Sequence, residues 1–348
     1  MNGITFHSLI SLVTIMKKIA LIVFVVCAAL GGCQSLYTTT ASAPKPLYRD
    51  SLYDGAADPV IVWNKQQQTW YMFYTNRRAN QPQLDGVTWV HGTRIGIATS
   101  KDGANWKYLD TADIQYRPVA DYTHWAPEVM EHNGLYHMYL TYVPGVFTDW
   151  KHPRDIVHLT STDLRHWKFE SVVKLASERV IDACVIARPG GGWRMWYNNE
   201  LDKKSIYYAD SDDLYHWTDK GKAVGDRGGE GPKVFYWKEY YWMLVDNWAG
   251  MSLYRSKDVT QWEKQPERIL EQPGTGAEDG ANGGHADVLV NGDRAYVYYF
   301  IHPGKNHPTD GYEKRRSLIQ VAELSLTNGW ITCDRNAPAK IQLSVSKK

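Results

Sequence analysis

The sequence predicts an all-β fold, a five-bladed β-propeller with four antiparallel strands in each blade. The first observation behind it is a strand pair that occurs five times: an apolar strand, then a returning strand rich in Tyr and Trp. The first strands read ADPVIVW from Ala57, WAPEVMEH from Trp125, IDACVIARP from Ile181, EGPKVFYW from Glu230 and HADVLVN from His285. The returning strands start at Trp70, Leu135, Trp193, Tyr240 and Arg294. Such repetition is typical of propellers and solenoids, and four strands in each repeat favour a propeller.

The second observation is a turn with the pattern Ser-x-Asp-x-x-x-Trp after the expected third strand. Its copies begin at Ser100, Ser161, Ser211 and Ser256, and the fifth decays to Ser325 and Trp330. The Trp residues recur at intervals of roughly 45 to 60 residues, within the range of repeat architectures. Ser and Asp side chains bond to the backbone of turns, and an indole packs between neighbouring elements. We therefore interpret these turns as scaffold and not as substrate contacts.

Composition agrees with one globular unit. The chain has 348 residues, 43% of them hydrophobic, and a formal net charge of +1. The repeats continue without a break, so residues 49–348 are expected to be one catalytic propeller domain, a monomer. No basic block or basic helical face occurs, so nucleic acid is not an expected partner.

The N-terminus is expected to be a lipoprotein signal peptide over residues 1–32. Met16-Lys17-Lys18 is a basic start, an apolar run follows, and Leu30-Gly31-Gly32-Cys33 resembles a bacterial lipobox. The apolar run is shorter than the roughly 20 residues of a membrane span. Cleavage would leave Cys33 lipidated, and residues 33–48, rich in Ser, Thr, Ala and Pro, are expected to be a flexible tether. By resemblance to bacterial lipoproteins, the protein is expected in the cell envelope, anchored to the outer membrane.

The candidate site follows from the strand pairing. In an antiparallel blade, the start of the first strand and the end of the second lie at one edge, so both reach the same rim of the central funnel. The first strands carry Asp58, Trp125, Asp182, Glu230 and His285 there, and the second strands end near Arg77, Asn199, Trp248 and His302. Long connections near residues 79–92, 144–155 and 303–314 are expected to form the walls of a pocket.

Three carboxylates around one funnel suit glycoside hydrolysis. One group protonates the leaving oxygen while another activates water or attacks the sugar. A third carboxylate raises the pKa of the acid by like-charge repulsion. We therefore take Asp58, Asp182 and Glu230 as the candidate catalytic residues, with closure of the propeller channel through salt bridges as the structural alternative.

These residues also carry a resemblance. From about residue 50 onward the chain resembles glycoside hydrolase family 43, five-bladed propeller enzymes that attack arabinofuranosides and xylosides. The resemblance implies that Asp58 in ADPVIV is the general base, Asp182 in VIDACV the pKa modulator and Glu230 in GEGPKV the general acid. The WAPEV segment at Trp125 is also similar to the family. His285 in GGHADV matches a histidine that lies beside a central water or calcium ion in many members.

The resemblance implies removal of terminal sugars by inversion, with a gap of roughly 6.5 to 9.5 Å between the Asp58 and Glu230 carboxyl groups. The resemblance implies no required cofactor. A central Ca²⁺ near His285 remains as an alternative. Trp125 and Trp248 are expected to stack on sugar, and Arg77, Asn199, His285 and His302 to contribute to substrate binding.

Several alternatives remain. The invertase and levansucrase families 32 and 68 share the fold, but Ala57, Ile181 and Gly231 depart from their motifs. Family 117 anhydro-galactosidases are thought to use a His as acid, which would assign this role to His285 or His302. A glycoside phosphorylase would need a cationic phosphate pocket, for which Arg77 and Arg78 are the candidates. The remaining class is a non-catalytic glycan-binding surface lipoprotein.

Overall fold

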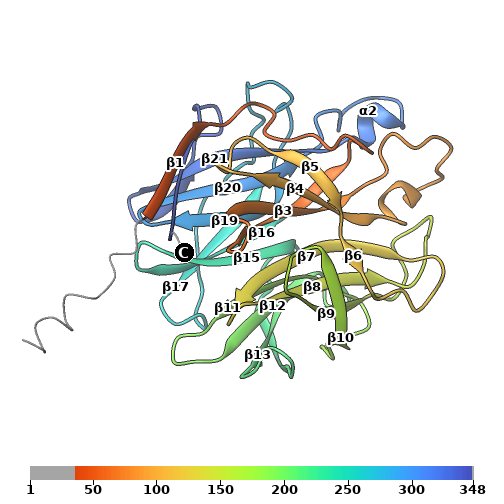
Figure 1. Cartoon of the computed structure of the whole chain (residues 1–348), viewed down its shortest axis with the longest axis horizontal. Coiled ribbons are helices and arrows are strands. Elements are labelled where there is room, and N and C mark those ends of the chain that lie inside the picture. The colour runs from red at the N-terminus through yellow and green to blue at the C-terminus, as the bar shows by residue number, and fades with distance from the viewer. Residues whose placement is uncertain (1–35, 347–348) are drawn as a thin grey trace, which may run out of the picture. The chain divides into compact units, whose positions relative to one another are not determined.

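Strands make up nearly all of the regular structure in residues 36–346, which the computed structural model describes (Figure 1). The helical segments among these residues are η1 (Thr88–Val90) and α2 (Tyr312–Arg315), and neither is long and apolar enough to cross a membrane. Thr39–Leu343 clusters as one compact unit. The expected signal peptide and Cys33 lie outside the described residues.

Within Thr39–Leu343 the strands form five antiparallel blades, which confirms the predicted propeller. Blade 1 contains β2 (Ala56–Asn64), β3 (Thr69–Asn76), β4 (Arg94–Ser100) and β5 (Lys107–Thr111). Blade 2 contains β7 (Thr123–His132), β8 (Leu135–Val143), β9 (Asp155–Ser161) and β10 (His166–Val172), with β6 (Asp113–Ile114) added parallel to β10. Blade 3 contains β11 (Val180–Ala187), β12 (Trp193–Asn199), β13 (Ser205–Ser211) and β14 (Thr218–Val224).

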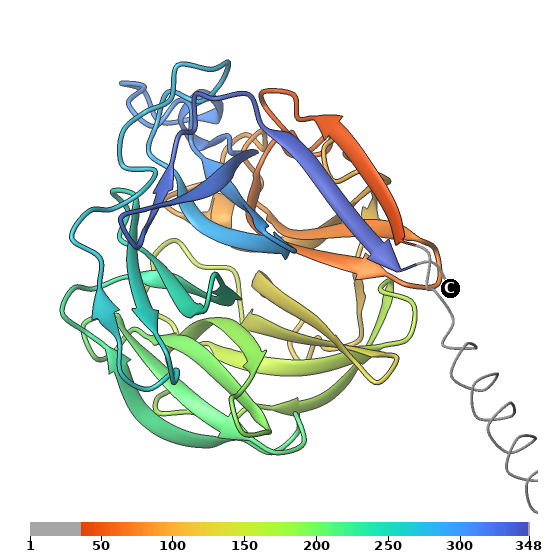
Figure 2. The ribbon, with the colours of Figure 1, turned by 90° about the vertical axis from the view of Figure 1, so that its left-hand side faces the viewer.

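Blade 4 contains β15 (Glu230–Trp237), β16 (Tyr240–Asp246), β17 (Met251–Ser256) and β18 (Glu263–Lys264). Blade 5 contains β19 (Gly284–Asn291), β20 (Arg294–Ile301), β21 (Leu318–Thr327) and β22 (Trp330–Cys333). Figure 2 shows the blades following one another around a common centre, from orange through green to blue. The first strand of each blade contacts the first strand of the next, and β19 meets β2 to close the ring.

Every first strand carries a β-bulge near its start. The pairing register shifts between Ala57 and Val60 in β2, and at the corresponding place in β7, β11, β15 and β19. Asp58 (φ 52°), Ala126 (φ 41°), Asp182 (φ 61°) and Gly231 (φ 56°) stand in these bulges with positive φ. A bulge bends its strand and re-aims a side chain. The bulges therefore determine what each blade presents at the centre.

The four Ser-x-Asp turns have the structural role that the sequence predicts. In blade 2, the Ser161 hydroxyl accepts the N–H groups of Asp163 (3.2 Å) and Leu164 (2.9 Å), and Asp163 accepts that of Arg165 (2.8 Å). Trp167, which ends this turn, is fully buried. In blades 1, 3 and 4 the Ser and Asp side chains of the turn also accept backbone N–H groups.

One expectation for the N-terminal segment differs from the structure. Residues 33–48 were expected to be a flexible tether, whereas β1 (Leu36–Ser42) pairs with β23 (Lys340–Ser346) near the other end of the chain. In β23, the Gln342 N–H donates to the Tyr296 hydroxyl of blade 5 (2.9 Å). The Thr-rich segment can form a strand because β-branched residues suit a ladder once a partner strand is available.

Candidate active site

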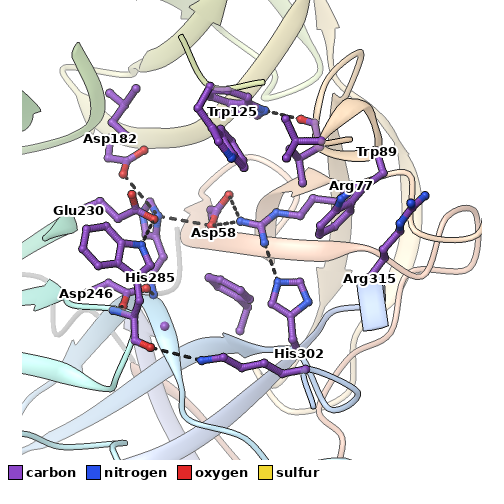
Figure 3. Close-up of a pocket in the computed structure, with 18 of the residues that line it drawn as sticks. Asp58, Arg77, Trp89, Trp125, Asp182, Glu230, Asp246, His285, His302 and Arg315 are labelled. Carbon is purple, nitrogen blue, oxygen red and sulfur yellow. Dashed lines mark hydrogen bonds and ion pairs between the residues drawn. The ribbon is translucent and has the colours of Figure 1, made fainter. Parts of the chain in front are cut away.

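The rim residues of the blades surround one cavity of about 960 Å³. Its lining includes eight of the nine predicted site residues: Asp58, Arg77, Trp125, Asp182, Glu230, Trp248, His285 and His302. Figure 3 shows Asp58 at the centre, with Arg77 and His302 on one side and Glu230, Asp182 and His285 on the other. All three long connections contribute walls, for example Trp89, Trp150 and Arg315.

Asp58 is a buried carboxylate with two basic neighbours. The Nη2 atom of Arg77 donates to both of its oxygens, at 3.2 and 3.4 Å, and Nδ1 of His285 lies 3.4 Å from Oδ1. Burial acts to raise the pKa of Asp58, but Arg77, His285 and a hydrogen bond from Thr75 together hold that pKa below its ordinary value. Asp58 is therefore ionised at neutral pH.

Asp182 has the opposite character. Burial, together with the nearby charges of Glu230 and Asp58, raises the pKa of Asp182 to about 7, although His285 opposes this shift. Its Oδ2 atom accepts the N–H of Gly231 (3.0 Å), the residue after Glu230. Asp182 thus gains or loses a proton near neutral pH, and it is bonded to the backbone directly after Glu230.

Glu230 does not occupy the same strand position as the other two acids. Asp58, Asp182 and His285 stand at the first bulge residue of their strands, whereas Glu230 stands one residue earlier, as Trp125 does. The three carboxylates therefore reach the same rim from two different positions of their strands. Trp248 donates its indole N–H to Oε1 of Glu230 (2.9 Å), and Nζ of Lys204 lies 3.4 Å from Oε2.

His285 lies among the acids. Its Nδ1 atom is 3.9 Å from Oδ2 of Asp182, and its backbone N–H donates to Asp246 (2.8 Å). Burial opposes a charge on the imidazole, but Asp182, Asp58 and other carboxylates outweigh it and raise the pKa of His285. The side chain therefore acts as a cation among the carboxylates.

His302 is a neutral imidazole. Its Nδ1–H donates to the Arg316 carbonyl (3.0 Å), and its Nε2 accepts from Nη1 of Arg77 (3.0 Å). Burial and the charge of Arg77 lower the pKa of His302 to about 3. His302 thus orients Arg77, which in turn pairs with Asp58.

The two predicted stacking residues differ in exposure. Trp125 is only 8% exposed, and its indole N–H donates to the Val90 carbonyl (2.6 Å). Trp248 is 44% exposed and has φ 59°. Trp248 therefore presents a ring surface beside Glu230, whereas Trp125 is mostly covered by protein.

The comparisons with known proteins agree with this geometry. The model of the family described as Glycosyl hydrolases family 43 matches residues 51–331, a range that runs from just before blade 1 into β22 of blade 5. The chain belongs to glycoside hydrolase family 43. It is therefore a glycosidase on a five-bladed propeller.

One curated relative of this family 43 chain is the extracellular exo-α-(1→5)-L-arabinofuranosidase ArbA of Cellvibrio japonicus, 32% identical over 89 residues. The match covers 24% of this chain and 20% of that protein, so the chain matches a fifth of the relative's length.

Solved structures share the fold of the family 43 chain. A thermostable family 43 glycoside hydrolase has a TM-score of 0.64 and 16% identity, with 82% of this chain and 96% of that chain covered. An exo-1,5-α-L-arabinanase from a bovine ruminal metagenomic library has a TM-score of 0.60 and 18% identity, covering 82% and 99%. Others include a β-xylosidase and a β-1,3-galactosidase.

One predicted binding residue of the family 43 chain lies outside the cavity. The Asn199 side chain is 5% exposed, and its Oδ1 accepts from the Ser177 hydroxyl (2.8 Å) and the Leu201 N–H (3.3 Å). It closes a turn at the end of β12, so the expectation that it binds substrate is not met by this placement. The next residue, Glu200, lines the cavity instead.

Other lining residues had no role in the site predicted from the sequence. Asp246 accepts the N–H groups of Trp248 (2.7 Å) and His285 (2.8 Å), and burial together with Glu230 raises the pKa of Asp246 to about 6. Its place opposite Glu230 in the β15–β16 ladder was the available signal. Lys204 and Arg154 come from loops, where no strand pattern predicts side-chain direction.

A metal ion at this site stays a prediction. Among residues 36–346, no group of three or more His, Cys, Asp or Glu side chains is arranged to hold one. Ca²⁺ takes six to eight oxygen ligands, and Nδ1 of His285 faces carboxylates as an ion-pair partner. The described side chains therefore fit a cationic imidazole better than a calcium ligand.

Proposed function

We propose that this glycosidase removes terminal arabinofuranoside-type or xyloside-type sugars from oligo- and polysaccharides with inversion of the anomeric centre. The observation that carries the proposal is the convergence of Asp58, Asp182 and Glu230 from three blades on one cavity, where the pKa of Asp58 is lowered and that of Asp182 is raised. The arabinofuranosidase named above and the exo-arabinanase fold neighbour support the choice of sugar.

In this mechanism Asp58 is the base. Arg77 and His285 keep its carboxylate ionised despite burial, so it can take a proton from water on one face of the sugar. Glu230 is the acid that protonates the leaving oxygen, with its carboxyl group positioned by Trp248 and Lys204. Asp182 modulates the acid, because the carboxyl groups of Asp182 and Glu230 disfavour a charge on both at once and the Asp182 oxygen binds the Gly231 N–H. Two carboxyl groups with different environments can thus divide the proton transfers.

His302 is the less favoured acid. It is held neutral by its bonds to the Arg316 carbonyl and Arg77, and its pKa near 3 leaves no proton to donate at neutral pH. His285 has a raised pKa, but its Nδ1 faces Asp58 and Asp182. These contacts favour Glu230 as the acid.

The walls of the cavity support action on chain ends. The long connections of blades 1, 2 and 5 contribute Trp89, Trp150 and Lys314 around the mouth. Walls on several sides suit one terminal sugar better than a polymer passing through. The exposed ring of Trp248 beside Glu230 is our candidate for stacking on that sugar.

The test is hydrolysis by the mature protein of aryl arabinofuranosides, xylosides and galactosides, with Asp58→Asn as the inactive control. Loss of the base should lower kcat by roughly 10²- to 10⁴-fold and leave substrate affinity nearly unchanged. NMR of the first product should show the inverted anomer. Retention of configuration, or full activity of Asp58→Asn, would contradict the proposal.

We also propose that Cys33 carries a lipid that anchors the enzyme in the bacterial cell envelope, at the outer membrane. The support is the apolar run and lipobox-like residues before Cys33. Expression of the full chain with Cys33→Ser should move the protein from the membrane fraction to the soluble fraction. An unchanged membrane fraction would refute the lipid anchor.

A further inference from the structure

A cluster of three cations around one carboxylate forms part of the cavity wall. Glu200 is 5% exposed in its side chain, and it lies 2.8 Å from Nε of Arg154, 3.7 Å from Nε of Arg179 and 2.8 Å from Nζ of Lys204. All four residues line the cavity. We call them the cationic wall.

The backbone fixes the two arginines beside each other. Arg154 and Arg179 form an isolated parallel bridge, and the Glu200 N–H donates to the Arg179 carbonyl (3.0 Å). Both guanidinium groups donate to the Trp150 carbonyl, Arg179 at 3.1 Å. The guanidinium groups are thus held in place before a ligand arrives, and such preorganisation favours binding.

In the protonation state that the proposed mechanism requires, the positive charges of the cationic wall outnumber the negative charges beside them. Lys204 also contacts Glu230 at 3.4 Å, but Glu230 must be protonated to act as an acid. Asp182, the other acid that acts on Arg154, is only partly ionised near pH 7. Three cations then face one carboxylate, Glu200. Partly buried cations need anionic partners, so a place remains for an anion from the ligand.

Aromatic rings lie next to these cations. The guanidinium carbon of Arg154 is 5.4 Å from the centre of the Trp125 ring, and the rings of Trp125 and Trp150 are 5.9 Å apart. Trp150 is 49% exposed and lines the cavity. An aromatic surface beside a cation can contact the apolar face of a sugar and its acidic group together.

We propose that the cationic wall binds an acidic sugar, one that carries a carboxylate or a sulfate ester, next to the linkage that is cleaved. Arg179 (24% exposed) and Lys204 (36% exposed) are the donors that reach the ligand, because Arg154 is 2% exposed. The position next to the linkage rests on the proposed role of Glu230, since Lys204 bridges Glu200 and Glu230. The glycosidase thus acts on acidic polysaccharide.

The test measures binding of free sugars by titration calorimetry to the wild-type chain at low salt. D-galacturonate and D-glucuronate present a carboxylate, D-galactose 6-sulfate presents a sulfate ester, and D-galactose is the neutral reference. We expect an acidic sugar to bind about tenfold or more tightly than galactose, because hydrogen bonds to charged groups are the strong ones. Preference for the uronates or for the sulfate identifies which anion is recognised.

Arg179→Gln should abolish most of this preference, and Arg179→Lys should keep part of it because the charge remains. The matched control is Lys203→Met. Lys203 is exposed, adjoins Lys204 and has nearly the same φ (53° and 55°), but does not line the cavity. Lys203→Met should bind the acidic sugars as the wild type does. Thermal unfolding of each variant checks that it is folded.

The outcomes separate this inference from the proposed function. Equal affinity for galactose and the acidic sugars, no binding of any acidic sugar, or a preference that survives Arg179→Gln would overturn the inference. Hydrolysis of neutral aryl glycosides alongside any of these results would leave the proposed function intact. Conversely, selective binding of acidic sugars by a chain that hydrolyses no glycoside would contradict the proposed function alone.

Discussion

At the scale of single residues, the cations next to a buried carboxyl group decide how readily it binds a proton. Asp58 and Asp182 are both buried bulge residues with positive φ. Of these two acids, Asp58 is the one that the guanidinium of Arg77 contacts, and the pKa of Asp58 is lowered while that of Asp182 rises to about 7. Similar positions thus become chemically different through their charged neighbours, among them Arg77 just after β3.

Arg77→Gln should move the acidic limb of the pH–activity profile to higher pH by about one unit or more. Without the guanidinium, burial raises the pKa of Asp58, so the base becomes protonated at a higher pH. In the wild type the lowered pKa of Asp58 stabilises the folded protein at pH values above the ordinary carboxyl pKa. This stabilisation is lost as the pH falls through the pKa of Asp58 in the folded state. The variant should therefore lose more activity at pH 5 than at pH 8.

The control for Arg77→Gln is Arg78→Gln. The Arg78 guanidinium donates to the Thr88 carbonyl, and Arg78 is not among the cavity-lining residues. Its removal should leave the acidic limb in place even if the protein becomes less stable. Equal shifts in both variants would show that Arg77 does not set the protonation of Asp58.

At the scale of elements, the β-bulge determines what a first strand presents. Residue Gly231 has φ 56° and stands beside His285, and a Cβ atom built on it would lie 2.7 Å from the His285 ring. Its N–H donates to Asp182. The bulge of β15 therefore couples the position of Glu230 to two other site residues.

Gly231→Ala should lower both stability and kcat. The positive φ costs about 1–2 kcal/mol for a residue with a Cβ, and the clash must also displace His285. Gly292→Ala is the control, since Gly292 has φ 60° with nothing within 4 Å of its added Cβ. The control should lose similar backbone stability in urea unfolding but keep kcat. Unchanged kcat in Gly231→Ala would contradict the role of this bulge.

At the scale of the whole propeller, a buried ion network joins the blades beneath the site. Lys233 of blade 4 lies 2.9 Å from Glu128 of blade 2 and 2.8 Å from Asp287 of blade 5. Glu128 accepts the Val185 N–H of blade 3 (3.1 Å), and Asp287 accepts the Ile61 N–H of blade 1 (2.7 Å). The network thus reaches all five blades formed by the described residues.

Lys233→Met should destabilise the propeller by about 3–5 kcal/mol at pH 7, because two buried carboxylates lose their cation. Burial already raises the pKa of Glu128 against the pull of Lys233, so without the lysine Glu128 should bind a proton more readily. The loss should therefore be smaller at pH 5 than at pH 7, as measured by urea unfolding.

Lys238→Met is the matched control for Lys233→Met. Lys238 directly follows β15, the strand that carries Lys233. Lys238 pairs with Asp293 at 2.8 Å, but this pair is exposed. Exposed ion pairs contribute about 0–1 kcal/mol, so this variant should unfold almost as the wild type does. Comparable losses in the two variants would argue against a special role for the central network.

The sequence by itself determined the blades and most of the site. The recurring strand pairs and Ser-x-Asp turns predicted five blades, because period-two patterns and turn chemistry are local properties of the chain. The sequence also predicted eight residues of the cavity lining, among them Asp58 and Glu230, because antiparallel pairing places the starts of first strands and the ends of second strands at one edge. These predictions needed no knowledge of how the blades meet.

Only the tertiary structure decided the rest. It placed Asn199 in a turn and Glu200 in the cavity, and it shifted Glu230 by one residue relative to Asp58. It also brought the loop residues Arg154 and Lys204 to one carboxylate. These outcomes depend on bulges, loop paths and contacts between distant blades. Sequence periodicity does not encode them, because charge and burial at a site arise only after the ring has closed.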